Sequence, residues 1–111
     1  MKALSVVLAL MPQFVAAQDW EPLRKDTAVI DALAGRTLVY DAYTFQRFGK
    51  LGDTQYITDR LSEGKWEARA GQYCSQWPPS DVWACYDIEV NDDRVRFIGS
   101  DRSISTGTYA K

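Results

Sequence analysis

Histidine is missing from all 111 residues of this chain. Its absence removes the commonest general base, the usual Ser–His and Cys–His nucleophile pairs, and the commonest zinc ligand. The sequence also lacks a glycine-rich phosphate-binding loop and a calcium-loop pattern. We therefore identify no catalytic residue, no metal ligand and no cofactor site, and the composition disfavours an enzyme.

An excess of positive charge and a second long apolar run are also lacking. The formal net charge of −2 argues against nucleic acid as a partner. The one apolar run, Ala3 to Met11, follows Lys2 and precedes the small residues Val15-Ala16-Ala17. This order is typical of a secretory signal peptide, and the run is shorter than the roughly 20 residues of a membrane-spanning helix. We predict a signal peptide at residues 1–17, a single β-rich domain at residues 18–111, a periplasmic or secreted location, and no stable membrane insertion after cleavage.

Cysteine occurs only twice, which allows one intramolecular bridge in an oxidising compartment. If Cys74 lies opposite Cys85 on antiparallel strands, their Cα atoms are close enough for a disulfide. Tyr73 then faces Tyr86, Gln76 faces Trp83, and residues 78–81 form a four-residue hairpin loop. The bridge would also fix the register, because a slip of one residue separates the two sulfur atoms.

The remaining sequence predicts one helix and several short strands. Asp26 and Thr27 offer N-cap side chains, a helical apolar pattern follows over Thr27–Ala34, and Gly35 stands where a helix commonly ends. Residues 18–25 look like an extended lead-in, and turns are expected at residues 48–53 and 62–64. We expect strands at residues 37–45, 54–58, 65–70, 72–77, 82–90, 94–98 and 103–109. The fold class is mainly β: an antiparallel meander of six to seven strands, curved into a sandwich or a small barrel, with one short N-terminal helix.

The first functional hypothesis is a non-catalytic binding or interaction module, whose partner would be an unknown protein or a small ligand. Trp83 is expected on the outer, polar face beside the disulfide, near Gln76 and above a loop stiffened by Pro78 and Pro79. Exposed aromatic faces can anchor proteins or flat ligands. The plainer alternative is structural, with Trp83 stacked on the disulfide and the prolines closing the hairpin.

Two other hypotheses remain open from the sequence. In one, the curved sheet encloses a small-ligand pocket lined by Trp66, Tyr73 and Tyr86, although core packing is the simpler role for Trp66. In the other, Asp87 and Glu89 share a strand face and act as the paired carboxylates of a hydrolase. The structural alternative for these carboxylates is pairing with Arg94 and Arg96 across the neighbouring strand.

Several short motifs occur in an order that suggests a family. They are Leu33-Ala34-Gly35 with Thr37-Leu38, Gly64-Lys65-Trp66, Tyr73-Cys74, Trp77 and Cys85-Tyr86. This order resembles a family of small exported alphaproteobacterial proteins that is catalogued as a domain of unknown function. The resemblance spans residue 28 to about residue 97 and implies a β-rich fold and a periplasmic address in a Gram-negative bacterium. It implies no activity.

Overall fold

The computed structural model describes residues 19–111, so the predicted signal peptide, residues 1–17, lies outside the described residues. This part of the chain forms nine strands and one helix. The helix is α1 (Asp26–Leu33), and the strands are β1 (Glu21–Leu23), β2 (Arg36–Asp41), β3 (Thr44–Phe48), β4 (Asp53–Ile57), β5 (Leu61–Arg69), β6 (Gln72–Gln76), β7 (Trp83–Asn91), β8 (Arg94–Ile98) and β9 (Ile104–Tyr109). Within residues 19–111, no helix has the length and apolar character needed to cross a membrane.

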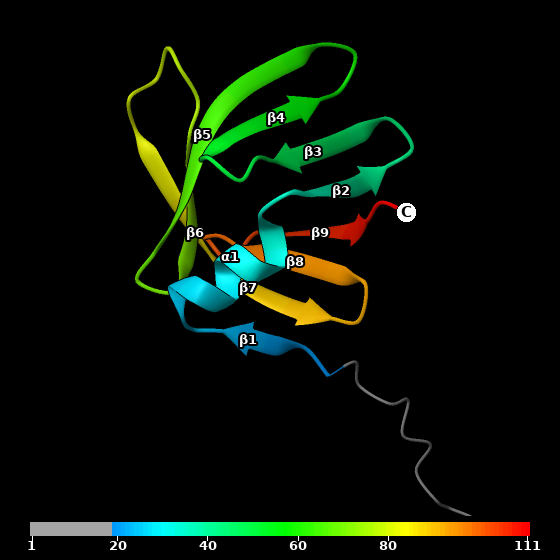
Figure 1. Ribbon diagram of the computed structural model, residues 1–111, viewed down its shortest axis with the longest axis vertical. Coiled ribbons are helices and arrows are strands. Elements are labelled where there is room, and N and C mark those ends of the chain that lie inside the picture. Colours follow the sequence, from blue (N-terminus) through cyan, green and yellow to red (C-terminus); the bar gives the residue numbers. More distant parts are fainter. Residues whose placement is uncertain (1–18) are drawn as a thin grey trace, which may run out of the picture.

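The sheet closes on itself. Each strand from β2 to β9 pairs antiparallel with the next, and β9 returns to pair with β2, so these eight strands form a barrel. The ninth strand, β1, pairs with the C-terminal half of β7, beyond the half that pairs with β6. Figure 1 shows the wrapped sheet, with the β4–β5 and β6–β7 hairpins at the top of the view and α1 and β1 below them. The predicted mainly β fold with one N-terminal helix is confirmed, and of the two predicted shapes, a sandwich or a small barrel, the sheet forms the barrel. The predicted six to seven strands are too few.

Two errors in the prediction explain why it gave fewer strands than the structure has. The expected lead-in contains β1, and the single strand expected at residues 37–45 is two strands, β2 and β3. The chain reverses at Ala42-Tyr43, where the backbone N–H of Tyr43 donates to the Asp41 carboxylate at 2.8 Å. An aspartate that accepts a bond two residues ahead favours a turn even within a run of strand-forming residues.

The turn expected at residues 62–64 is also wrong, because these residues lie inside β5. Gly64 is needed there for close packing, not for a turn. A Cβ atom at this position would lie 2.6 Å from the Trp77 ring and 2.7 Å from the Gln76 carbonyl oxygen. Glycine in a strand often marks such a close approach.

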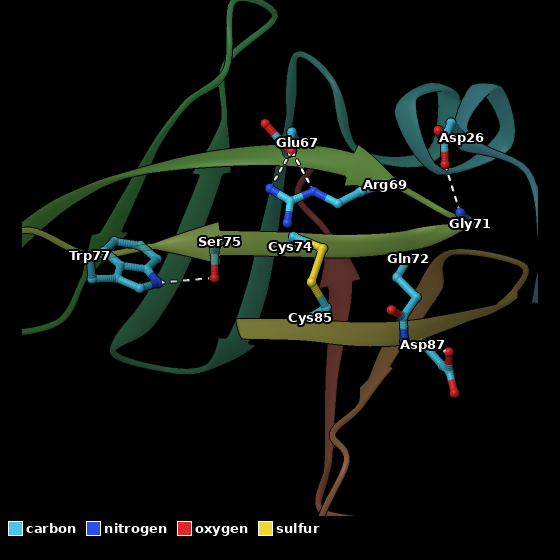
Figure 2. Close-up of a disulfide and its surroundings, with 10 residues drawn as sticks. All are labelled: Asp26, Glu67, Arg69, Gly71, Gln72, Cys74, Ser75, Trp77, Cys85 and Asp87. Atoms are coloured by element: carbon cyan, nitrogen blue, oxygen red, sulfur yellow. Dashed lines mark hydrogen bonds and ion pairs between the residues drawn. A yellow bond between two sulfur atoms is a disulfide. The ribbon is translucent and has the colours of Figure 1, made fainter. Parts of the chain in front are cut away.

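The β6–β7 hairpin has the predicted register. Cys74 pairs with Cys85, Tyr73 with Tyr86 and Gln76 with Trp83. The predicted disulfide is present, with its two Cα atoms 4.0 Å apart, and it lies on the outer face of the barrel (Figure 2).

Helix α1 covers one end of the barrel. Val29 and Leu33 are fully buried against Leu38, Phe48 and Val95 inside the sheet. A helix of eight residues is not stable alone, so this packing must hold it.

The start of the helix differs from the prediction. Its N-cap residue, Lys25, makes no side-chain capping bond. The carboxylate of Asp26 instead accepts the backbone N–H of Gly71 at 2.6 Å, which fastens the helix to the β5–β6 turn (Figure 2).

Candidate functional site

The end of the barrel opposite α1 holds a pocket. Its volume is about 1000 Å³. It opens between the ends of the β2–β3, β4–β5, β6–β7 and β8–β9 hairpins, and this end of the barrel is called the open end below. The lining residues are Tyr40, Asp41, Thr44, Gln46, Tyr56, Arg60, Leu61, Ser62, Glu63, Tyr73, Ser75, Trp77, Pro78, Tyr86, Phe97, Ser105 and Thr106.

A β-bulge shapes one side of this pocket. The register of β2 against β3 shifts between Val39 and Asp41, so Tyr40 is an extra residue. Successive side chains of a regular strand point to opposite faces, but here both Tyr40 and Asp41 line the pocket. The bulge therefore places an aromatic ring and a carboxylate side by side on the wall.

Aromatic rings form much of the wall. Tyr56 and Trp77 meet edge to face with their ring centroids 6.2 Å apart, and Tyr40 lies 5.9 Å from Tyr56. Tyr73 and Phe97 continue this cluster toward the core at 5.1 Å. Such pairs prefer offset or edge-on contacts, which hold each ring in a fixed orientation.

A polar network forms the floor of the pocket, around the buried side chain of Gln46. The Tyr40 hydroxyl donates to the Gln46 Oε1 atom at 2.7 Å. The Gln46 Nε2 group donates to the Tyr73 hydroxyl at 2.9 Å and to Thr54 Oγ1 at 3.1 Å. Among the described residues, every buried side-chain nitrogen or oxygen has a hydrogen-bond partner. The floor is therefore polar and well ordered.

The tyrosines of the floor stay neutral. Burial raises the pKa of Tyr40, and the neighbouring Tyr73 and Tyr56 raise it further. Burial likewise raises the pKa of Tyr73, although hydrogen bonds with Ser75 and Gln46 oppose the shift. The floor thus presents hydroxyl oxygen atoms to a ligand and carries no charge.

The open end exposes apolar side chains. Each of its four turns has one exposed large apolar residue in it or directly beside it: Tyr43 at 80%, Leu61 at 58%, Val82 at 68% and Ile104 at 56% exposure. The wall and its surroundings can therefore contact an apolar group as well as a polar one.

The predicted pocket residues Tyr73 and Tyr86 do line this pocket, but Trp66 does not. Trp66 lies deeper in the core, against Phe48 with ring centroids 5.8 Å apart, and its indole N–H donates to the Gly49 carbonyl at 2.9 Å. Core packing, the simpler role for Trp66, is confirmed.

Of the predicted outer-site residues, Gln76 and Trp83 are direct cross-strand neighbours, whereas Pro78 lines the pocket. Trp83 is half-buried on the outer face, and the Arg69 guanidinium lies 5.2 Å from its ring centroid. Arg69 also pairs with Glu67 beside the disulfide (Figure 2). The Gln76 amide donates to the Asp81 carbonyl at 2.9 Å, across the base of the loop.

The two prolines of that loop are both exposed, but they differ in their relation to the pocket. Pro78 lines the pocket, whereas Pro79 does not. Trp77, which precedes them, turns its indole N–H toward Ser75 Oγ at 3.1 Å (Figure 2). The loop therefore supports the pocket wall from one side.

The paired carboxylates lie away from the pocket. Glu89 forms an ion pair with Arg96 at 2.6 Å, as the structural alternative predicted. Asp87 accepts a bond from the Gln72 amide at 3.0 Å (Figure 2). Neither carboxylate lines the pocket, and each is engaged with a neighbouring side chain.

Three pocket residues, Tyr40, Gln46 and Tyr56, were not predicted from the sequence. A signal was present for Gln46, since it alternates with Thr44 and Phe48 and so shares their face. A glutamine on the apolar face of a strand suggests an internal polar network. The contribution of Tyr40 depends on a bulge, which the sequence alone does not reveal.

Comparison with models of protein families found no match, and neither did comparison with curated proteins or with solved structures. The resemblance to the exported alphaproteobacterial family therefore stays a prediction. Among residues 19–111, no group of three or more side chains of the kinds that bind metals is placed to hold an ion.

Proposed function

We propose that this protein binds a small, ring-bearing organic molecule in the pocket at the open end of its barrel. The observation that carries the proposal is a pocket of about 1000 Å³ with an aromatic wall and a fully hydrogen-bonded polar floor. Small-molecule sites are commonly concave, largely apolar and equipped with a few fixed polar groups. Eight-stranded barrels are also wide enough to hold one small ligand.

The rigidity of the site supports binding. The rings of Tyr56 and Trp77 restrain each other, and Gln46 is fixed by three hydrogen bonds. A ligand that enters a preformed site loses less free energy to ordering of the protein. The ring of the ligand would lie against the aromatic wall, and its polar group would face the tyrosine hydroxyls. We propose no reaction, because the carboxylates that line the pocket stand at its rim and not beside the polar floor.

We place this binding in the periplasm or outside the cell. The disulfide Cys74–Cys85 is compatible with an oxidising compartment. The N-terminal signal-peptide pattern, which lies outside the described residues, also favours a periplasmic or extracellular location.

Two tryptophan variants separate this proposal from the outer-site hypothesis. The probes are benzyl alcohol, indole and methyl glucoside, titrated into the protein and followed by NMR. Trp77→Ala removes part of the wall, so we expect the affinity for at least one probe to fall about fivefold or more. Trp83→Ala removes a ring of the same type from the outer face and should leave the affinity within about twofold.

Both variants are first checked for cooperative unfolding, which excludes global misfolding as the cause of a loss. If Trp83→Ala abolishes binding and Trp77→Ala does not, the ligand site is the outer face, and the pocket proposal is wrong. Absence of binding by all three probes would also count against the proposal.

A further inference from the structure

We infer that the pocket selects organic cations: molecules that carry a positively charged nitrogen group on a ring. The inference rests on the proposed small-ligand function and adds the charge of the ligand. Three independent features of the open end lead to it.

The first feature is the charge of the open end. Its hairpins carry five carboxylates, Asp41, Asp59, Glu63, Asp81 and Asp101, against two guanidinium groups, Arg60 and Arg102. A second, smaller groove differs, since it is lined by Arg36, Arg47 and Lys50 together with Asp53. Charges of one sign around a cleft raise the local concentration of ions of the other sign.

The second feature is Glu63 at the rim of the pocket. Glu63 is one of the lining residues, near the start of β5, and its carboxylate forms no hydrogen bond or ion pair with any residue that the structure describes. The carboxylate of Asp41 differs, because its own turn already uses it. Glu63 is therefore an uncompensated negative charge at the pocket mouth, where it attracts a cation.

The third feature is the state of the aromatic faces. Several rings away from the pocket already have an arginine above them: Arg36 lies 3.7 Å from the Tyr109 ring centroid, and Arg96 lies 4.3 Å from that of Trp20. Within residues 19–111, no such contact involves the pocket rings Tyr40, Tyr56 or Trp77. Aromatic faces attract cations, most strongly when water is excluded, so the pocket rings remain available to a cation from solution.

The floor offers little to an anion. Both amide protons of Gln46 and the hydroxyl proton of Tyr40 are already used within the network. Arg60 is the one cation among the lining residues, and it stands in the exposed β4–β5 turn. A carboxylate or phosphate ligand would be repelled by Glu63 and Asp41, and Arg60 would be its one positively charged partner among the lining residues.

Three probes that share a benzyl or phenyl ring test the inference: benzyltrimethylammonium, benzyl alcohol and benzoate. Their dissociation constants are measured by NMR titration at low ionic strength. We expect the cation to bind about three- to tenfold more tightly than the alcohol, and benzoate to bind most weakly. Added salt should narrow the gap between the cation and the alcohol, because it screens the exposed carboxylates.

The matched variants are Glu63→Gln and Glu21→Gln, which remove the same charge at the pocket and on the exposed strand β1. Glu63→Gln should lower the preference for the cation about threefold or more and leave the affinity for benzyl alcohol unchanged, whereas Glu21→Gln should alter neither. Equal affinity for benzoate and the cation, or an unchanged preference in Glu63→Gln, would overturn the inference while the pocket proposal stands. Binding of none of the three probes would overturn both.

Discussion

At the scale of single residues, Gln46 connects the core to the pocket. It is 4% exposed, and it joins tyrosines from two other strands, Tyr40 and Tyr73. A buried amide costs free energy unless it is hydrogen-bonded, so the network is stable only because all its members are satisfied. The same bonds hold the tyrosine hydroxyls in place at the floor of the pocket.

The buried tyrosines make stability depend on alkaline pH. Tyr40 has a raised pKa in the folded protein, against an ordinary value of 10.0. The unfolded chain therefore loses this proton first, and the stabilising contribution is complete below pH 10 and is lost as the pH rises above it. We expect the free energy of unfolding to fall above pH 10 by about 1.4 kcal/mol per pH unit for each tyrosine held neutral.

Urea unfolding of the wild type and of Tyr40→Phe across this pH range measures the effect. The variant should lose about 1 kcal/mol at pH 8, where only the bond to Gln46 is missing. Above pH 10 its stability should fall less steeply than that of the wild type. Parallel curves would contradict a neutral, buried Tyr40.

At the scale of secondary-structure elements, α1 and the β6–β7 hairpin act on opposite ends of the barrel. The helix seals one end with Val29 and Leu33. The hairpin carries Trp77 and Pro78 to the other end, and the disulfide fixes its two strands in register. A loop closed by residues 11 apart gives the bridge about 3 kcal/mol of stabilisation in the chain-entropy account.

Two substitutions in α1 test its role as a seal. Leu33→Ala removes a fully buried side chain, and we expect the free energy of unfolding to fall by about 3 kcal/mol. Ile30→Ala is the control on the same helix, at a side chain that is 43% exposed. It should change stability by no more than about 0.5 kcal/mol, as surface substitutions usually do. Equal losses in urea unfolding would show that helix formation, not burial against the barrel, sets the effect.

The sequence predicts local structure well where one strong constraint acts. The cysteine pair and the alternation around it gave the β6–β7 register, and Gly35 does adopt a positive φ of 75° directly after the helix. Prediction failed where a residue serves a distant neighbour. Gly64 resembles a turn residue but makes room for Trp77, and Asp26 resembles a cap but binds Gly71.

The closure of the barrel and the pocket could not be predicted for the same reason. Closure requires Leu38 and Val39 of β2 to pair with Tyr109 and Thr108 of β9, which lie far away in the sequence. Sequence periodicity reports which face a residue occupies, but not which strands become neighbours. Tyr73 and Tyr86 were correctly placed inside, whereas the depth of Trp66 depends on the helix that seals its end.

At the scale of the whole molecule, the two ends of the barrel differ in packing. One end is filled by α1 and the aromatic core, and the other holds the pocket among acidic hairpins. One small domain can therefore contain both a packed core and a cavity, because different side chains form the core and the pocket wall.

The indole N–H resonances of Trp20, Trp66, Trp77 and Trp83 provide the most direct measurement. Each reports on a different place: the outer face beside β8, the core, the pocket wall and the outer face beside the disulfide. Titration with benzyltrimethylammonium should shift the Trp77 resonance in a saturable manner, because its indole lines the pocket and donates to Ser75. The Trp20 and Trp83 resonances should stay in place. A saturable shift of Trp83 with none at Trp77 would contradict a ligand site inside the barrel.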